Sequence, residues 1–433
     1  MHSRAVDVGP SGRSAHLPMI AAHWRSIVFV FLPFALGYFL SYFFRTINAL
    51  LAAPLTTELG LDASHLGLMT SVYFLTFAAI QLPLGALMDR YGPRRVQSGM
   101  LLIAAVGAVV FGTADRFETL VIGRGLIGLG VACSLVGGLK AIVMWFPKER
   151  VSLLNGCFIM LGTLGAVVAT VPTEWLLSHI GWRSLLELLA AATAIAALVI
   201  FLVVPELAQA APTASGAPAD RLRDIFADRR FWRLAPLSTM CISTAWAVQG
   251  LWAAPWLTDV DRLDRPYVVA HLFVMGISLS VAALLFGIFA DRMRSRGVQP
   301  QTILRSAALL FVSTEAVLIL DVHSLSYALW AVVAGMGGAT VLSSSIIAEY
   351  FPKEITARAN AALTMFHIGG AFILQELIGW MINRWPSEAG HYPSLAYKTA
   401  LALILVPQVV ALLWFAGFDR KLRALVPKFS PAP

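Results

Sequence analysis

The sequence predicts an all-α integral membrane protein with twelve transmembrane helices in two similar six-helix bundles. The first reason is composition: 58% of the 433 residues are hydrophobic and 13% are charged, whereas soluble domains average about 25% charged residues. The second reason is that apolar runs of roughly 20 residues, the length that crosses a bilayer, recur along the whole chain. The third is that two motifs each occur twice at nearly the same spacing, which predicts a duplicated six-span unit.

Twelve apolar runs are long enough to span a bilayer, and an even number places both termini on the same side. The predicted spans are 27–54, 64–86, 97–114, 118–146, 151–177, 184–203, 233–257, 267–290, 301–321, 325–349, 355–382 and 395–418. The predicted domains are an N-terminal tail (1–25), a first bundle (26–203), a linker (204–232), a second bundle (233–418) and a C-terminal tail (419–433). An Ala- and Pro-rich stretch at 205–220, followed by a charged piece, indicates the linker.

Basic residues predict the orientation. Most of them lie in segments on the same side as the N-terminus, such as Arg90, Arg150 and Arg292, and few lie in the other loops. Because cytoplasmic loops carry an excess of Lys and Arg, we expect both termini in the cytoplasm of a bacterium, with the chain in its inner membrane. The net charge of +8 then reflects topology, and no nucleic-acid partner is expected.

Several classes of protein are excluded by what the sequence lacks. Cys133, Cys157 and Cys241 fall within predicted spans and offer neither a disulfide framework nor metal-site spacing. The chain carries no nucleophile–base set and no phosphate-binding loop, so we expect neither an enzyme nor a cofactor. Residues 1–25 are polar and run directly into an apolar span that is longer than a signal core, which argues against a cleavable signal peptide.

The most specific motif lies between the second and third spans, at Gly85-Ala86-Leu87-Met88-Asp89-Arg90-Tyr91-Gly92-Pro93-Arg94-Arg95. A degraded copy, Gly287-Ile288-Phe289-Ala290-Asp291-Arg292, follows about 200 residues later. A second pair, Trp145-Phe146-Pro147-Lys148-Glu149 and Tyr350-Phe351-Pro352-Lys353-Glu354, has nearly the same offset.

The first motif resembles the signature loop of the major facilitator superfamily, G-x-L-x-D-R-x-G-R-[RK], and the resemblance extends over the whole chain. It implies a secondary transporter whose halves rock around a central site. Asp89 would pair with a helix end of the opposite half and hold the outward-open state, while Arg90, Arg94 and Arg95 would bind carboxylates or lipid headgroups. The expected gating residues are Gly85, Asp89, Arg90, Gly92, Arg94, Arg95, Gly287, Asp291 and Arg292.

Helical phase places a polar stripe on the first span. Its members are Tyr38, Ser41, Tyr42, Arg45 and Asn48. A guanidinium inside a span suits carboxylate or phosphate recognition, and the alternative is a structural ion pair with a neighbouring carboxylate. In several anion-transporting branches of the superfamily an Arg of span one contacts the substrate. Phe44 stands where the proton-coupled sugar-acid branch has a carboxylate, so that coupling mechanism does not carry over.

Two further spans carry polar faces. Span seven presents Thr239, Ser243, Trp246, Gln249 and Trp256, and span eleven presents Asn360, Thr364, His367 and Gln375. The resemblance implies that spans one, seven and eleven border the central cavity. The expected substrate-binding residues are therefore Arg45, Tyr38, Tyr42, Asn48, Trp246, Gln249, His367 and Gln375.

Proton coupling requires a titratable group within the membrane. Glu174, Glu187, Glu315, His367 and Glu376 are the available carboxylates and histidine, and His367 is preferred, although a hydrogen-bonded neutral histidine is the alternative. Arg124-Gly125-Leu126-Ile127-Gly128 resembles the span-four motif R-x-x-x-G, which is linked to coupling. The coupling candidates are Arg124, His367 and Glu376. Lys140 lies about 160° around the same helix from Arg124, so the two face the cavity together only if the helix bends.

These residues predict a proton-coupled importer of a small organic anion, carboxylate-bearing or phosphorylated, working as a monomer in the bilayer. A drug/proton antiporter is one alternative, although span five lacks that group's Gly-Pro. Copper import is another: His271 and Met275 form H-x-x-x-M, but span seven offers only Met240 and Arg45 disfavours a cation. A sensor that binds a ligand without transport is the third.

Overall fold

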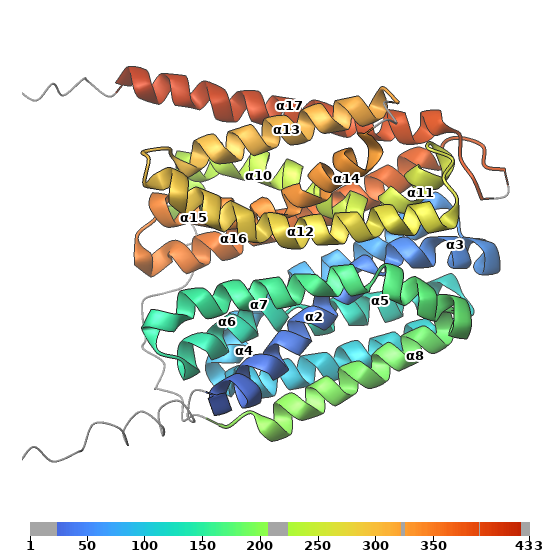
Figure 1. Ribbon diagram of the computed structural model, residues 1–433, viewed down its shortest axis with the longest axis horizontal. Coiled ribbons are helices and arrows are strands. Elements are labelled where there is room, and N and C mark those ends of the chain that lie inside the picture. Colours follow the sequence, from blue (N-terminus) through green and yellow to red (C-terminus); the bar gives the residue numbers. More distant parts are fainter. Residues whose placement is uncertain (1–23, 207–223, 322–324, 389, 426–433) are drawn as a thin grey trace, which may run out of the picture.

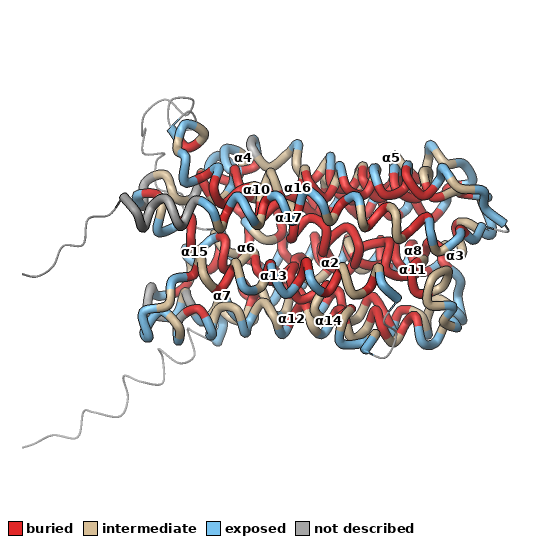
Figure 2. Tube along the Cα trace, turned by 90° about the horizontal axis from the view of Figure 1, so that it is seen from above, coloured by how far each residue is buried: buried red, intermediate tan, exposed pale blue. Residues whose placement is uncertain are grey.

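The computed structural model describes residues 24–206, 224–321, 325–388 and 390–425, and within them it is helical apart from turns and one isolated β-bridge, Glu388 with His391. The helices form two groups, with α2–α8 in the lower half of Figure 1 and α10–α17 in the upper half. Figure 2 shows buried residues running through the interior along the length of both groups.

The N-terminal group begins with a π-helical turn and contains seven α-helices. Its elements are η1 (Ile27–Phe31), α2 (Leu32–Thr46), α3 (Asn48–Leu59), α4 (Ala63–Gly112), α5 (Phe117–Val131), α6 (Ser134–Trp145), α7 (Lys148–Val168) and α8 (Val171–Val203).

The C-terminal group repeats this order of long and broken helices. Its elements are α10 (Arg229–Ala247), η2 (Val248–Trp252), α11 (Ala253–Asp259), α12 (Arg265–Arg294), α13 (Pro300–Ile319), α14 (Ser326–Gly335), η4 (Met336–Ala339), α15 (Thr340–Tyr350), α16 (Lys353–Ile382) and α17 (Ser394–Leu425).

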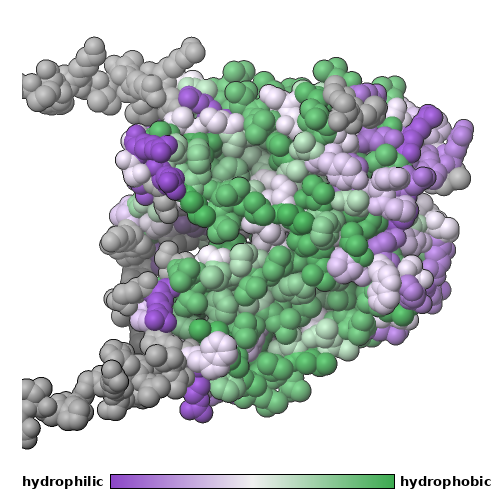
Figure 3. Space-filling model, in the orientation of Figure 1, coloured by the Kyte–Doolittle hydropathy of each residue, from purple (hydrophilic) through white to green (hydrophobic). Residues whose placement is uncertain are grey.

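Twelve crossings of a membrane can be traced in these elements. Ten helical stretches of the described ranges are long and apolar enough to span, and residues 153–168 form a shorter apolar helix. The remaining crossing consists of α10, η2 and α11, which follow one another from 229 to 259. The surface carries a broad apolar belt between two hydrophilic ends (Figure 3). The twelve-helix, all-α fold predicted from the sequence is thus confirmed.

The predicted spans five and six are consistent with the backbone. Span five, expected over 151–177, is broken: α7 ends at Val168, the chain kinks at 169–170, and helical residues 171–180 lead to Gly181. Gly181, with φ of 73° and ψ of 169°, separates these residues from the helix of span six, which was expected over 184–203. Gly92 bends α4 in the same way, with φ 78° and ψ 157°, and so separates spans two and three. This backbone region is essentially restricted to glycine.

The duplication is visible in where the helices break. In the first crossing α2 gives way to α3 at Ile47, and in the seventh the π-helical η2 occupies 248–252. In the fourth crossing α5 and α6 are separated at 132–133, and in the tenth the 3₁₀ segment η4 occupies 336–339. Broken helices near the bilayer midplane are where transporters place binding sites, so these breaks direct attention to their flanking side chains.

The two halves meet through small residues. A Cβ placed on Gly67 of α4 would come within 2.9 Å of the Gln375 carbonyl and 3.3 Å of Gly379 on α16. A Cβ on Gly276 of α12 would come within 3.2 Å of Val167 on α7. Glycine at these points lets helices of opposite halves approach closely.

Candidate functional site

Arg45 lies at the contact between the two halves, two residues before the break at Ile47. Its guanidinium carbon is 4.7 Å from the ring centroid of Tyr42 on the same helix and 4.7 Å from that of Trp246 on α10. Phe77 of α4 lies 6.0 Å away. Cation–π contacts of this kind hold a cation in place without neutralising it.

No carboxylate pairs with this guanidinium in the described ranges. Its Nε and one Nη are shielded from solvent and lack a hydrogen-bond partner there, and its ionisable neighbours are the hydroxyls of Tyr38, Tyr42 and Tyr73. The alternative of a structural ion pair therefore finds no partner among these residues. An unpaired buried charge is costly, and the cation–π contacts with Tyr42 and Trp246 are the compensation found for it among the described residues.

Other donors gather at the same place. The side chains beside Arg45 come from both halves and pack so closely in this conformation that only a gap too small for a solute remains between them: Tyr42, Arg45, Thr46, Trp246, Gln249, Gly250 and Leu279. The Nε1 of Trp246 and the Nε2 of Gln249 are buried without hydrogen-bond partners in the described part of the chain. These N–H groups and the guanidinium are hydrogen-bond donors of the kind that bind the oxygens of an oxyanion.

Gln375 reaches this site from α16. Both atoms of its side-chain amide are buried and unpartnered as far as the described residues show. A Cβ built on Gly250 would lie 3.6 Å from Gln375 Nε2 and equally 3.6 Å from the Arg45 carbonyl oxygen. Spans one, seven and eleven therefore meet here, which is the arrangement that the resemblance implied.

Three of the predicted binding residues are engaged elsewhere. The ring of Tyr38 stacks on Phe158 of α7, 5.2 Å between centroids, and Asn48 donates to Thr70 Oγ1 at 3.0 Å. His367 Nε2 hydrogen-bonds Ser238 Oγ at 2.7 Å and lies 6.1 Å, edge on, from the ring of Trp246. Asn48 and His367 are therefore hydrogen-bonded to other residues, whereas Tyr38, whose ring stacks on Phe158, keeps its hydroxyl among the neighbours of Arg45.

Arg124 is a second buried cation in the N-terminal half. Its guanidinium lies 4.5 Å from the ring centroid of Tyr73, and the Tyr73 hydroxyl donates to the Ser41 carbonyl on α2 at 3.4 Å. Tyr73 therefore connects Arg124 on α5 with the helix that carries Arg45. The other coupling candidate, Glu376, accepts a long hydrogen bond of 3.5 Å from Ser71 of α4.

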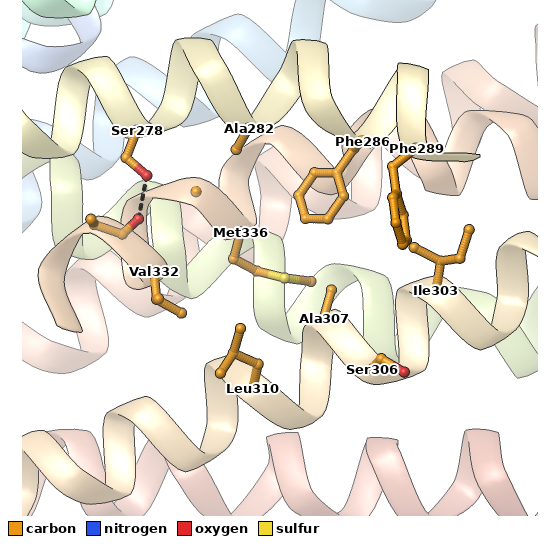
Figure 4. A pocket seen from close by; sticks show the side chains of 12 residues that line it. Ser278, Ala282, Phe286, Phe289, Ile303, Ser306, Ala307, Leu310, Val332 and Met336 are labelled. Atoms are coloured by element: carbon orange, nitrogen blue, oxygen red, sulfur yellow. Dashed lines mark hydrogen bonds between the residues drawn. The ribbon is translucent and has the colours of Figure 1, made fainter. Parts of the chain in front are cut away.

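A larger space lies away from this contact. A pocket of about 400 Å³ between α12, α13 and α14 is lined by apolar side chains such as Phe286, Leu310 and Met336, with serines at its edges (Figure 4). Ser278 donates to the Ala331 carbonyl across it. No charged residue lines this pocket, so it offers nothing that would recognise a charged solute.

Comparison with known proteins decides the family. The model of the Major Facilitator Superfamily matches residues 34–374. The chain belongs to this superfamily. The relatives it matches are named as transporters, which places it among membrane transporters and not among enzymes.

Two relatives and one solved structure define the resemblance. The nitrate/nitrite transporter NrtP of Picosynechococcus sp. is 33% identical over 115 residues, which are 27% of this chain and 21% of the relative. The probable sulfoacetate transporter SauU of Cupriavidus necator is 31% identical over 149 residues, 34% of each protein. The matched segments thus span about a fifth and a third of these relatives' own length. A bacterial homologue of the human lysosomal transporter Spinster, solved in an inward-facing, unoccupied conformation, has a TM-score of 0.74 at 17% identity, covering 94% of this chain and 99% of that one.

The signature loop of the superfamily has its own contacts here. Asp89 accepts a 2.6 Å hydrogen bond from Lys140 of α6, a residue of its own half, and this contact turns Lys140 toward the loop. Arg94 Nε donates to the Phe201 carbonyl at 2.8 Å, and Arg95 pairs with Glu206. In this conformation the loop is therefore tied to α6 and to the end of α8.

The remaining loop residues are exposed or only partly described. Gly85 is exposed with open space where a Cβ would stand, and the guanidinium of Arg90 lies 5.2 Å from the ring of Tyr91. In the second copy Gly287 is partly buried and Arg292 is exposed, whereas the Asp291 side chain lies outside the described part of the structure. Arg294, at the position of Gly92, bonds Glu349 of α15 at 2.5 Å.

Sequence reasoning missed the polar contacts at the end of the molecule that is predicted to face outward. Arg265 of α12 donates through Nε and Nη2 to the two oxygens of Glu174 on α8, at 2.8 and 2.7 Å, and to the Leu50 carbonyl at 3.0 Å. From the sequence, Glu174 was considered only as one of the titratable groups in the spans. The one available signal was that both residues were predicted near outer span ends, and sequence alone does not show that those ends meet.

The connection between α16 and α17 adds a second outer contact. Asn383 donates to Asp62 at 3.2 Å, and the Ala63 backbone N–H donates to the Tyr392 hydroxyl at 3.1 Å. Since Asp62 and Ala63 begin α4, this connection joins the C-terminal half to the N-terminal half.

The copper hypothesis finds no geometric support. His271 hydrogen-bonds the Tyr267 carbonyl at 2.7 Å and Ser326 at 3.0 Å, and its ring stacks on Tyr327 at 3.7 Å. Met275 is fully buried one turn further along α12. No cluster of three or more His, Cys, Asp or Glu residues suited to a metal occurs in the ranges searched.

Proposed function

We propose that this protein is a secondary transporter of the bacterial inner membrane that imports a small anion together with protons by alternating access, with both termini in the cytoplasm. The observation that carries the proposal is the unpaired guanidinium of Arg45, held between Tyr42 and Trp246 where the two halves meet. A bound anion would supply the missing negative charge.

The chemistry of the relatives supports the class of cargo. One is named for nitrate and nitrite and the other for sulfoacetate, which are all oxyanions. A planar guanidinium fork binds such oxygens in pairs. The donors of Trp246, Gln249 and Gln375 add hydrogen bonds that fix the orientation of the anion.

The position of the site supports alternating access. Arg45 belongs to the N-terminal half, and Trp246 and Gln249 belong to the C-terminal half. The polar contacts of Arg265 with Glu174 and of Asn383 with Asp62 close the outer end. We infer an inward-facing conformation, from which rocking of the halves would part these contacts and open the site to the outside.

The alternatives fit the site less well. A drug/proton antiporter for lipophilic cations would have to bind them beside a fixed guanidinium, which repels them. A copper importer would need soft ligands in the cavity, and His271 is occupied elsewhere.

The test is anion exchange in proteoliposomes. Purified protein loaded inside with unlabelled nitrate or sulfoacetate should take up the labelled anion. Arg45→Gln should abolish this exchange, and Arg45→Lys should restore it only in part because ammonium lacks the planar fork. Arg116→Gln, at an exposed outer position, is the matched control and should exchange normally. Uptake of lipophilic cations by the Arg45→Gln protein at the wild-type rate, with no anion exchange in wild type, would overturn the proposal.

A further inference from the structure

A buried carboxyl group lies behind the proposed site, on the far side of α10. Glu315 of α13 is only 2% exposed. It neighbours Gln408 of α17 and Cys241 of α10. Neither of its oxygens receives a hydrogen bond within the described ranges.

The hydrogen bonds around Glu315 indicate whether its carboxyl group is neutral or ionised. Thr244 Oγ1 donates to the Met240 carbonyl at 2.7 Å and accepts from Gln408 Nε2 at 3.1 Å. Gln408 Oε1 is left without a partner in the part of the chain that is described. Because Gln408 Nε2 is engaged by Thr244, the free acceptor Gln408 Oε1 is the atom that a protonated Glu315 would bind, and a carboxyl can use an acceptor only when it carries a proton.

The charged groups around Glu315 do not favour its ionised form. Cys241 is the titratable side chain that faces it from α10. Arg233, eight residues earlier on α10, lies 5.0 Å from the ring of Phe415. Lys398 of α17 pairs with Asp321, beyond the end of α13. An ionised carboxylate buried without a compensating cation is costly, so this conformation holds the neutral acid.

We propose that Glu315 carries the proton that accompanies the anion, and that its protonation state is transmitted to the site through Gln408 and Thr244. When the O–H proton leaves for water, the carboxylate needs a donor, and rotation of the Gln408 amide supplies its NH₂. Gln408 Oε1 then turns to Thr244, whose hydroxyl donates to it and releases the Met240 carbonyl. One proton is exchanged and no other covalent bond changes.

The position of Thr244 on α10 explains how a change in the protonation of Glu315 affects the anion site. Thr244 and Trp246 are two residues apart, about 200° around the helix, so they occupy opposite faces of α10. The π-helical η2 follows at Val248–Trp252, and such segments mark adjustable points in helices. A change in the bonding of α10 behind the site therefore moves the ring that covers Arg45. This inference rests on the proposed function, because it assigns the proton of the same transport cycle.

The experiment separates exchange from proton-driven accumulation in the same proteoliposomes. Glu315→Gln keeps a neutral side chain of the same size, so anion exchange at equal pH should be retained. For one proton per anion, an imposed pH gradient of one unit supports at most about tenfold accumulation of the anion. Glu315→Gln should lose this accumulation, and it should also lose the proton entry that an enclosed pH dye reports. Glu118→Gln, at an exposed acid in the first turn of α5, is the matched control and should keep both activities.

Each result has one meaning. The role of Glu315 would be overturned if Glu315→Gln still accumulated the anion. It would also be overturned if this variant lost both exchange and accumulation while its elution and melting showed that it was folded. Loss of accumulation with retained exchange in His367→Gln instead would assign the proton to His367. Absence of anion exchange in the wild-type protein would contradict the proposed function itself. If Glu315→Gln does not fold, the infrared carbonyl band of a protonated acid in wild type, compared with Glu315→Asp across pH, decides whether Glu315 titrates.

Discussion

The guanidinium of Arg45 and the ring of Trp246 are 4.7 Å apart and come from opposite halves of the molecule. Their contact is thus part of the surface along which the halves would separate. Trp246→Leu should weaken anion binding by roughly 1 kcal/mol or more, about fivefold in Kd, because the guanidinium loses a cation–π partner and becomes free to move. Trp246→Phe should recover much of this loss.

Anion-dependent thermal shift or isothermal titration measures the Trp246 effect. Trp232→Leu is a control of the same kind, since Trp232 lies at the exposed start of α10. Equal affinities of Trp246→Leu and wild type would show that Trp246 does not form the site.

The bidentate pair of Arg265 and Glu174 should stabilise the outward-closed state. Both side chains are partly buried, with 34% and 25% of their surface exposed. The pair should therefore stabilise the outward-closed state by about 1 kcal/mol, which is roughly a fivefold change in the population of that state. Glu174→Gln should therefore increase labelling, from the outside, of a single cysteine introduced at Ala52, which is buried between the halves in this conformation. The exchanged pair Arg265→Glu with Glu174→Arg should restore wild-type labelling. Unchanged labelling in Glu174→Gln would show that the pair has no role in closure.

Gly92 and Gly181 should resist substitution for a backbone reason. Their φ and ψ values fall in a region that residues with a Cβ avoid, at a cost on the order of 1–3 kcal/mol. Gly92→Ala and Gly181→Ala should each lower the thermal midpoint in detergent. Gly99→Ala is the matched control, because Gly99 is helical with open space for a Cβ. A midpoint for Gly181→Ala equal to that of Gly99→Ala would contradict the assignment of strain.

Glu58, beyond the outer end of the predicted first span, should contribute acid-dependent stability. The indole N–H of Trp182 and the guanidinium of Arg183 hold the pKa of its carboxyl below the ordinary value. A lowered pKa means that the folded form favours the ionised group. Its contribution is therefore present above about pH 4.3, the ordinary glutamate value, and is lost as the pH falls below it through the folded-state value.

Thermal melts between neutral pH and the acid limit of the protein measure this effect. Glu58→Gln should lower the midpoint at neutral pH and flatten its decline on acidification, relative to Glu118→Gln. Parallel declines in both variants would show that Glu58 does not contribute.

Much of the fold followed from the sequence because it depends on local composition. Apolar length located the crossings, and the repeated motifs predicted two equivalent halves. The break of span five at 169–170 was not predicted, because a kink inside an apolar run leaves hydropathy unchanged and only the backbone angles reveal it.

The site was predicted in part, for a related reason. Helical phase correctly grouped Tyr42 with Arg45 and Trp246 with Gln249, since phase is a property of each helix alone. Phase does not tell which neighbour a side chain meets. Asn48 and His367 were therefore expected in the cavity, whereas in the structure Asn48 bonds to Thr70 and His367 bonds to Ser238.

The sequence by itself determined the family, the number of crossings and the presence of an arginine within the first span, because hydropathy and short motifs act along the chain. Only the tertiary structure decided that Arg45 faces no carboxylate in the described ranges, that Glu174 meets Arg265, and that Glu315 lies against Gln408. Those pairs join helices far apart in sequence. Whether a buried charge finds a partner depends on that packing, and the partner in turn decides whether the charge stabilises the fold or is free to bind a solute.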